Sequence, residues 1–324
     1  NILDYNEFKF ILSIQFALGL IDNNQFSRIT QEYFAYQLKI ICDALSFNYK
    51  YFIAGLGSFG NSEMNFSSDI DLIVLVEEIT NRQEMEMDFQ HFLKVAQEKF
   101  PNLEIDFRLR PEGKNSLLVW DFEHYRIYLS NRAEFWEFQT LMKIGYLVGD
   151  KALFKKFNNE ILFQFKNRKT SFTIDSIKKL HNKSTQIISP NNYNLFDIKK
   201  SCGGFLTIDY TLQLLFLMNN ELAYKAIGKS QTFAIDILIS KNLYPEKLKQ
   251  VKINYLLMKK ILISHQNYFN TAGYRIKYDS DDINSFARYI GFESSQKLNE
   301  TLMGLAKDNY ITLLNIFNNL SEEE

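Results

Sequence analysis

The sequence predicts an α+β protein, with a small sheet and flanking helices in its first half and an all-α helical bundle behind it. Two apolar runs at 51–54 and 72–76 have the length and composition of buried strands. In the second half, apolar residues recur at helical spacing to the end of the chain. We therefore expect helices in 1–48 that pack on a head over 49–168, followed by a helical bundle over 169–324.

Further apolar stripes at helical spacing define the other elements of this architecture. Asp4 is expected to cap the first helix, because its carboxylate can accept hydrogen bonds from the first free N–H groups. Residues 103–110 alternate apolar and charged side chains, which predicts a half-exposed strand. Turn-forming residues at 189–192 mark a candidate domain edge. The predicted helices cover 4–22, 25–46, 84–100, 121–129, 134–146, 152–166, 173–187, 205–219, 231–242, 245–264, 282–290, 294–306 and 308–320.

Composition and charge narrow the class of protein. The chain is 46% hydrophobic and 23% charged with a net charge of −1, so neither nucleic acid nor a membrane surface is expected as a partner. Cys42 and Cys202 are too few for a disulfide framework, which favours a reducing compartment. The four histidines are far apart in the sequence, so a structural zinc site is not expected. We expect a cytoplasmic protein.

The most informative stretch is a glycine-rich turn followed by two aspartates. Gly57, Ser58 and Gly60 follow the first predicted strand, and such a turn lets backbone N–H groups approach a phosphate closely. Asp69 and Asp71 lead into the second strand, where residues two apart point to the same face. Two carboxylates held that close repel each other unless a cation lies between them. The natural cation for such hard oxygen ligands is Mg²⁺ carrying substrate phosphates.

Asp106 lies in the alternating segment after the next predicted helix, and two interpretations of it compete. The first is a solvated strand face held by charge pairs. The second is a third carboxylate of the metal site, with Arg108 or Arg110 on a phosphate. We favour the second, because the aspartate pair lies upstream with one helix between them.

A second glycine-rich segment occurs in the helical half, where Lys199 and Lys200 precede Gly203 and Gly204. A double glycine before an apolar helix can leave N–H groups free, and a helix start flanked by lysines suits a phosphate. A plain helix start with a flexible lead-in explains the segment equally well. Both interpretations stay open at this point.

The motifs together resemble a known family. A glycine-serine turn followed by Asp-x-Asp is typical of the DNA polymerase β-like nucleotidyltransferases. More specifically, the chain resembles the glutamine synthetase adenylyltransferase/deadenylase family in four ordered blocks. The blocks are 55–73, 106–113, 136–150 and 197–213.

The resemblance implies a polymerase β-like nucleotidyltransferase head, built on a small mixed sheet with flanking helices. It implies Asp69, Asp71 and Asp106 as catalytic residues and as ligands of Mg²⁺ or Mn²⁺, with ATP as substrate. The residues expected to bind the nucleotide are Gly57, Ser58, Gly60, Ser68, Arg108, Arg110, Lys143 and Lys199.

The resemblance also implies a reaction. Family members transfer AMP from ATP to a tyrosine of glutamine synthetase and remove it by phosphorolysis, using two such units, and this chain has the length of one. We expect transfer of AMP to a protein hydroxyl, with glutamine synthetase as the partner and a nitrogen-signalling regulator as a further candidate partner. The alternatives are phosphorolytic removal of AMP and a degenerate half that binds nucleotide in a regulatory role.

Four positions depart from the family pattern. Lysine is usual where Ser58 stands, arginine is usual where Ser62 and Gly145 stand, and a glutamate is replaced by Asp209. Serine is the residue that the wider superfamily uses at the first position, so Ser58 does not count against catalysis. Each positive side chain lost beside a triphosphate weakens binding by about 1.5–3 kcal/mol. We therefore expect an altered substrate or a lower activity.

Overall fold

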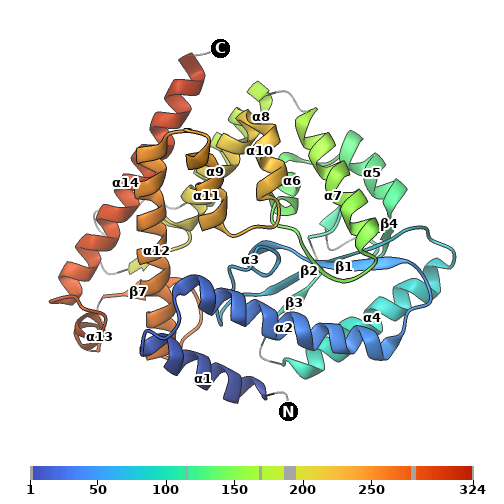
Figure 1. Ribbon diagram of the computed structural model, residues 1–324, viewed down its shortest axis with the longest axis horizontal. Coiled ribbons are helices and arrows are strands. Elements are labelled where there is room, and N and C mark those ends of the chain that lie inside the picture. Colours follow the sequence, from blue (N-terminus) through green and yellow to red (C-terminus); the bar gives the residue numbers. More distant parts are fainter. Residues whose placement is uncertain are drawn as a thin grey trace. The chain divides into compact units, whose positions relative to one another are not determined.

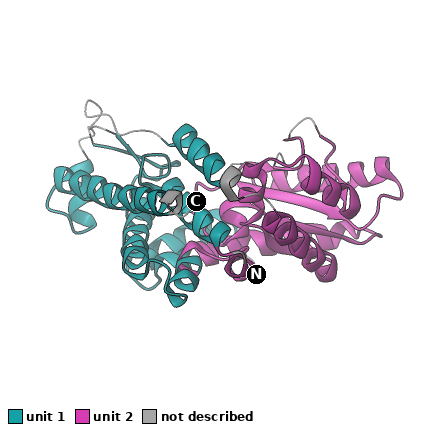
Figure 2. Cartoon of the chain, turned by 90° about the horizontal axis from the view of Figure 1, so that it is seen from above, with its two compact units in different colours: residues 1–26, 170–218, 234–324 teal, residues 27–169, 219–233 magenta. Residues whose placement is uncertain are grey.

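The chain falls into two compact units, described separately below (Figure 2). Unit 1 comprises 1–26, 170–218 and 234–324, and unit 2 comprises 27–169 and 219–233. The structure is a computed structural model that describes residues 3–101, 103–107, 109–113, 116–167, 170–185, 195–278 and 282–322.

Unit 2 contains the sheet and the helices that cover it (Figure 1). Helix α2 begins in unit 1 and continues into this unit. The elements are α2 (Asn23–Leu45), β1 (Tyr51–Gly55), α3 (Gly57–Gly60), β2 (Ile70–Val76), α4 (Arg82–Lys99), β3 (Ile105–Asp106), β4 (Trp120–Asp121), α5 (Phe122–Asn131), α6 (Phe135–Leu141), β5 (Gly145–Gly149), α7 (Lys151–Lys166) and α10 (Asn220–Ala226).

The sheet of unit 2 is mixed. Its strand order is β3-β2-β1-β5, and β4 also pairs with β2. Strand β1 runs antiparallel to β2 and β5, whereas β3 and β4 run parallel to β2. This sheet with its flanking helices confirms the predicted α+β class and the mixed sheet of the head.

Alternation along β1 places helices on both faces of the sheet. The Phe52 ring contacts Phe154 and Phe157 of α7, with ring centroids 5.3 and 5.6 Å away. Its neighbour Tyr51 contacts Phe89 of α4 at 5.7 Å. Because successive strand side chains point to opposite faces, these contacts assign α7 to one face and α4 to the other. Figure 1 shows the same two layers of helices around the sheet.

Two elements of unit 2 differ from the sequence prediction. Among the described residues of the predicted strand 103–110, only β3 is a strand. Arg110 donates hydrogen bonds to the carbonyl oxygens of Phe107 and Ser116, which holds the loop after β3. The predicted helix 134–146 ends as α6 at Leu141, and β5 follows. Strand β5 forms because its apolar residues pair with the exposed edge of β1, a long-range contact that overrides local helical spacing.

Unit 1 is built from helices and one two-stranded ribbon. Strands β6 and β7 pair antiparallel, with Phe196 opposite Ile276. The two helices predicted for 294–306 and 308–320 form one helix, α14, because no proline or turn sequence interrupts them. The elements are α1 (Tyr5–Ala17), α8 (Thr170–Ser184), β6 (Leu195–Asp197), α9 (Phe205–Met218), α11 (Gln231–Ser240), α12 (Pro245–Tyr268), β7 (Arg275–Lys277), α13 (Ile283–Tyr289) and α14 (Ser295–Glu322).

The first helix belongs to unit 1. Asp4 caps α1 as predicted, with its carboxylate accepting from the N–H groups of Asn6 and Glu7. Ser13 donates a hydrogen bond to Asn267 of α12 at 3.3 Å, and Phe8, Leu12 and Phe16 of α1 are buried. Residues 1–26 therefore cluster with the helical unit, whereas the sequence suggested that all of 1–48 packs on the head. A hydrogen bond between side chains 254 residues apart leaves no signal in local sequence spacing.

A distant segment, 219–233, joins unit 2. The Gly228 N–H donates to the Met142 carbonyl oxygen at 3.0 Å, and the Gln231 N–H donates to the Glu63 carboxylate at 2.9 Å. The sequence assigned this segment to the helical bundle, since its helical spacing alone does not reveal which partner it contacts. Within the described part of the chain, no helix has the length and apolarity needed to cross a membrane.

Candidate nucleotide and metal site

Two of the three predicted carboxylates lie side by side at the end of the sheet. Asp71 of β2 pairs in register with Asp106 of β3, and Ile70 pairs with Ile105. Neighbouring strands are about 4.8 Å apart, so residues paired in a parallel ladder present their side chains next to each other. Ile70 and Ile105 are buried, whereas both aspartates are half-buried. The two carboxylates therefore lie on the accessible side of the strand pair.

Asp69 lies just outside this pair. It is exposed and immediately precedes β2, two residues before Asp71. Among the residues described, no group of three or more His, Cys, Asp or Glu side chains is already arranged to hold a metal ion. The donor chemistry nevertheless fits Mg²⁺, which takes one or two carboxylates and completes its shell with water and substrate phosphate oxygens.

The glycine turn contacts the aspartate pair directly. The Leu56 N–H donates to the Asp71 carbonyl oxygen at 2.8 Å, which fixes the start of α3 beside β2. Gly57 has a φ of +54°, and a Cβ atom added there would lie 2.8 Å from Asp71 Oδ2. No described residue accepts a hydrogen bond from the N–H groups of Gly57, Ser58 or Phe59. Backbone donors and a carboxylate thus meet at one point, and their predicted role in binding phosphate and metal stays a prediction.

Gly60 holds the turn against β5. A Cβ atom added to Gly60 would collide with the carbonyl oxygens of Lys143 and Gly55, and one added to Gly145 would collide with the Gly60 carbonyl oxygen. Glycine at 145 is therefore required by the close approach of two backbones. This packing gives a structural reason for glycine where the family pattern has arginine.

The loop from α3 to β2 is fixed by its own polar groups. Ser68 is 3% exposed, and its hydroxyl oxygen accepts a hydrogen bond from the Asn65 N–H at 3.0 Å. Asn65 in turn accepts from the Ser67 N–H at 2.8 Å. Ser62 adopts a left-handed φ of +60°. Ser68 thus shapes the loop that delivers Asp69, and its predicted contact with nucleotide stays a prediction.

Of the two predicted arginines, Arg108 and Arg110, the structure describes Arg110. Arg110 donates to the main chain of the 107–116 loop, at 2.7 Å to Phe107 O and 2.8 Å to Ser116 O. Burial lowers the pKa of its guanidinium, and the carboxylates of Glu86 and Asp106 oppose that effect. Arg110 therefore orders the loop that follows β3 and lies within electrostatic reach of Asp106. Arg108 lies outside the described residues.

Lys143 lies in the turn between α6 and β5, next to Gly60. The turn is also held from its other side, because the Gly228 N–H donates to the Met142 carbonyl oxygen and a Cβ atom at Gly228 would collide with Ile144. The sequence did not reveal Gly228 and the Glu63–Gln231 hydrogen bond as supports of the site. A glycine at 228 was visible, but its long-range partner was not.

Lys199 belongs to unit 1, whereas the residues above belong to unit 2. Its ammonium lies over the Tyr274 ring, 4.9 Å from the centroid. The N–H of Gly203 donates to Thr207 Oγ1 at 2.8 Å, and that of Gly204 donates to the Ser201 carbonyl oxygen at 2.7 Å. The double glycine is thus a helix start whose donors are used within the chain. Of the two interpretations, the structure favours the plain helix start.

The mixed sheet, the aligned aspartates and the adjoining glycine turn are the arrangement of a nucleotidyltransferase head. Comparison with known proteins shows what this head is similar to. Residues 43–160 match the family model of glutamate-ammonia ligase adenylyltransferase. This segment, which contains β1 to β5 and all three aspartates, is similar to that family, and the predicted resemblance is confirmed for it.

Curated relatives extend the match to about half of the chain. They are bifunctional glutamine synthetase adenylyltransferase/adenylyl-removing enzymes. The relative from Shewanella frigidimarina is 30% identical over 53% of this chain and 20% of its own length. Those from Psychromonas ingrahamii and Mannheimia succiniciproducens are each 30% identical, over 51% and 54% of this chain and 19% and 20% of their own. The matched region thus spans about a fifth of each relative.

Proposed function

We propose that the chain is a Mg²⁺-dependent adenylyltransferase, which transfers AMP from ATP to a protein hydroxyl. The observation that carries the proposal is the in-register pair of Asp71 and Asp106, with the Gly57 turn against the Asp71 carboxylate. Carboxylates next to unused backbone N–H groups offer ligands for a cation and for phosphate oxygens at the same place. The family match over this segment supports a nucleotide as the phosphate-bearing substrate.

Asp69, Asp71 and Asp106 would hold the metal. When bound, Mg²⁺ or Mn²⁺ polarises the α-phosphate and neutralises the leaving pyrophosphate. The exposure of Asp69 and the half-burial of the other two leave room for substrate phosphates. Backbone donors of the turn at Gly57 and Ser58 would orient the triphosphate, with Lys143 as a candidate cation beside the turn.

The acceptor hydroxyl must lose its proton as the new phosphorus–oxygen bond forms. Asp106, or Asp71 through a water, would accept that proton. The oxygen attacks the α-phosphorus, and the bond to the pyrophosphate oxygen breaks. The names of the relatives support glutamine synthetase as the protein acceptor, and a tyrosine as its modified residue follows from the family resemblance.

The test is mass spectrometry of glutamine synthetase after incubation with the chain, ATP and Mg²⁺. A gain of one AMP on one tyrosine is expected, with loss of the signal when Asp69→Asn and Asp71→Asn are combined. Asp236→Asn is the matched control, because Asp236 pairs with Lys252 in unit 1. Activity of the double variant within several-fold of the wild type would contradict the metal assignment.

Removal of AMP is the second candidate, because the relatives are named for both activities. The same site would then take phosphate as the attacking group, with adenylylated glutamine synthetase as substrate. Incubation of the modified synthetase with phosphate distinguishes the two directions, since only removal releases ADP. If ATP with Mg²⁺ raises the melting temperature and neither reaction occurs, the chain is a nucleotide-binding regulatory half.

A further inference from the structure

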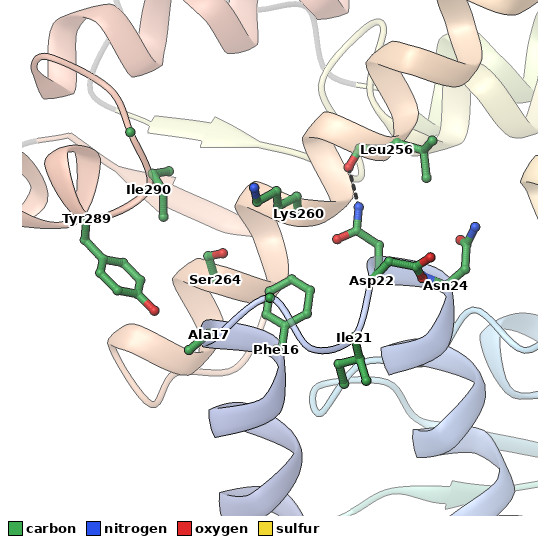
Figure 3. Close-up of a pocket in the computed structure, with 13 residues that line it drawn as sticks. Phe16, Ala17, Ile21, Asp22, Asn24, Leu256, Lys260, Ser264, Tyr289 and Ile290 are labelled. Carbon is green, nitrogen blue, oxygen red and sulfur yellow. Dashed lines mark hydrogen bonds between the residues drawn. The ribbon is translucent and has the colours of Figure 1, made fainter.

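Unit 1 contains a pocket that the adenylyl chemistry does not use. It has a volume of about 610 Å³ and lies where the turn between α1 and α2 meets α12 and the end of α13 (Figure 3). All of its lining residues belong to unit 1. The volume falls within the roughly 300–1,000 Å³ that is usual for small-molecule sites.

The walls of the pocket are fixed by hydrogen bonds. Asn23 Nδ2 donates to the Leu256 carbonyl oxygen at 2.7 Å, a bond drawn as a dashed line in Figure 3. Ser13 of α1 donates to Asn267, which follows Leu256 further along α12. Because α1 and the start of α2 are each tied to α12, the space beside the turn between them is a formed cavity.

Hydroxyl and ammonium groups that can donate hydrogen bonds line this cavity. Ser264 is only 7% exposed, yet no described residue exchanges a hydrogen bond with its hydroxyl. The Lys260 ammonium, one helical turn earlier on α12, makes no ion pair or hydrogen bond to the described part of the chain. Tyr289 supplies a second hydroxyl from the end of α13. Because these groups line the pocket, an acceptor bound there would take hydrogen bonds from them.

The pocket carries one formal charge of each sign, and the two differ in how they are compensated. Asp22 and Lys260 are the charged residues among the described lining. Asp22 Oδ1 already accepts hydrogen bonds from the N–H groups of Asn24 and Gln25, both at 2.8 Å. The start of α2 therefore compensates this carboxylate, as helix N-termini do for anions. The ammonium of Lys260 has no such compensation.

We propose that this pocket binds a small organic anion. Its carboxylate or phosphate group pairs with the Lys260 ammonium and accepts hydrogen bonds from Ser264 and Tyr289. Its short apolar body packs against the apolar side chains of Phe16 and Ile290, which line the pocket. The site lies in the unit without the aspartate pair, so the inference is independent of the proposed function.

Isothermal titration of the full chain at constant ionic strength tests the class of ligand. The probes are benzoate, phenyl phosphate and benzylamine, which share a ring and differ in the charged group. Saturable binding of benzoate or phenyl phosphate is expected, and the tighter of the two identifies the preferred head group. Failure of both anions to bind, or an equal affinity for benzylamine, would overturn the proposal.

Variants then locate the site. Lys260→Gln should weaken the better anion about tenfold or more, and Ser264→Ala about threefold, as expected for a charged and a neutral hydrogen-bond donor. Lys249→Gln, another exposed position on α12, should leave the affinity unchanged. Lys260 is exposed, so its replacement preserves the fold, which circular dichroism checks. Unchanged anion binding by Lys260→Gln would overturn the proposal whatever Ser264→Ala does.

Discussion

The two glycine-rich turns of this chain look alike in sequence and differ in structure. At 55–60 the N–H groups of Gly57 and Ser58 reach no described acceptor, and the Asp71 carboxylate lies beside them. At 199–204 the N–H groups of Gly203 and Gly204 both donate within the chain. The difference teaches that a glycine turn offers a phosphate site only where its donors are left unused.

The glycines themselves serve two different ends. Gly57 is needed because a side chain would intrude on Asp71, whereas Gly203 is needed because a side chain would overlap the Ala306 carbonyl oxygen of α14. Replacing the first should therefore disturb chemistry, and replacing the second should disturb packing. Substitutions in these turns, and in the residues packed against them, test that distinction.

The largest effect is expected from Gly145→Arg, which restores the residue typical of the family. Its Cβ atom would collide with the Gly60 carbonyl oxygen, and neither backbone can move without displacing β5 from β1. We expect a loss of about 3 kcal/mol or more in the free energy of unfolding, from overpacking of two backbones. Urea denaturation measures it.

Ser62→Arg is the matched control for Gly145→Arg, because it restores the other arginine at a position that already carries a side chain. Its φ of +60° is the same before and after the change. We expect a change of less than about 0.5 kcal/mol in stability, as is usual at surface positions. A Gly145→Arg variant with wild-type stability and higher transferase activity would contradict this prediction. It would mean that glycine at this position lowers the activity and is not required by the packing.

Gly203→Ala should cost about 2–4 kcal/mol of stability, from overlap with Ala306 together with a φ of +86°. Affinity for ATP should not change in the folded fraction. Gly304→Ala is its control. Gly304 lies on α14, the helix that carries Ala306, and no atom lies within 4 Å of the methyl group added there. Weaker ATP binding by Gly203→Ala at full stability would restore the phosphate interpretation of this segment.

Gly57→Ala tests the other turn. The methyl group would press on Asp71 Oδ2, so the aspartate must move. Because small misplacements of catalytic groups are costly, we expect transfer of AMP to slow by about a hundredfold. Gly273→Ala has a left-handed φ of +98° and open space around the added methyl group, so it controls for backbone strain. Equal transfer rates in both variants would separate Gly57 from the chemistry.

The sequence was sufficient where the signal is local. The run at 72–76, the turn at 55–60 and the alternation that carries Asp106 predicted the strands and the aspartates that lie in register. It was insufficient where a partner lies far along the chain, as for β5, which local spacing made helical, and for Gly228, which supports the Lys143 turn from a segment assigned to the bundle. The internal use of the Gly203 N–H had a local signal, since Thr207 lies four residues ahead.

The smallest effect is expected from Lys199→Gln. The Lys199 ammonium lies over the Tyr274 ring, and the donors beside it are used, so ATP affinity should change less than about twofold. Lys143→Gln, beside the turn whose donors are unused, should weaken ATP about tenfold through loss of a charge-assisted contact. Titration of each variant with ATP and Mg²⁺ compares them directly. A larger loss of ATP affinity in Lys199→Gln than in Lys143→Gln would instead assign nucleotide binding to unit 1. The second glycine turn would then be a phosphate site.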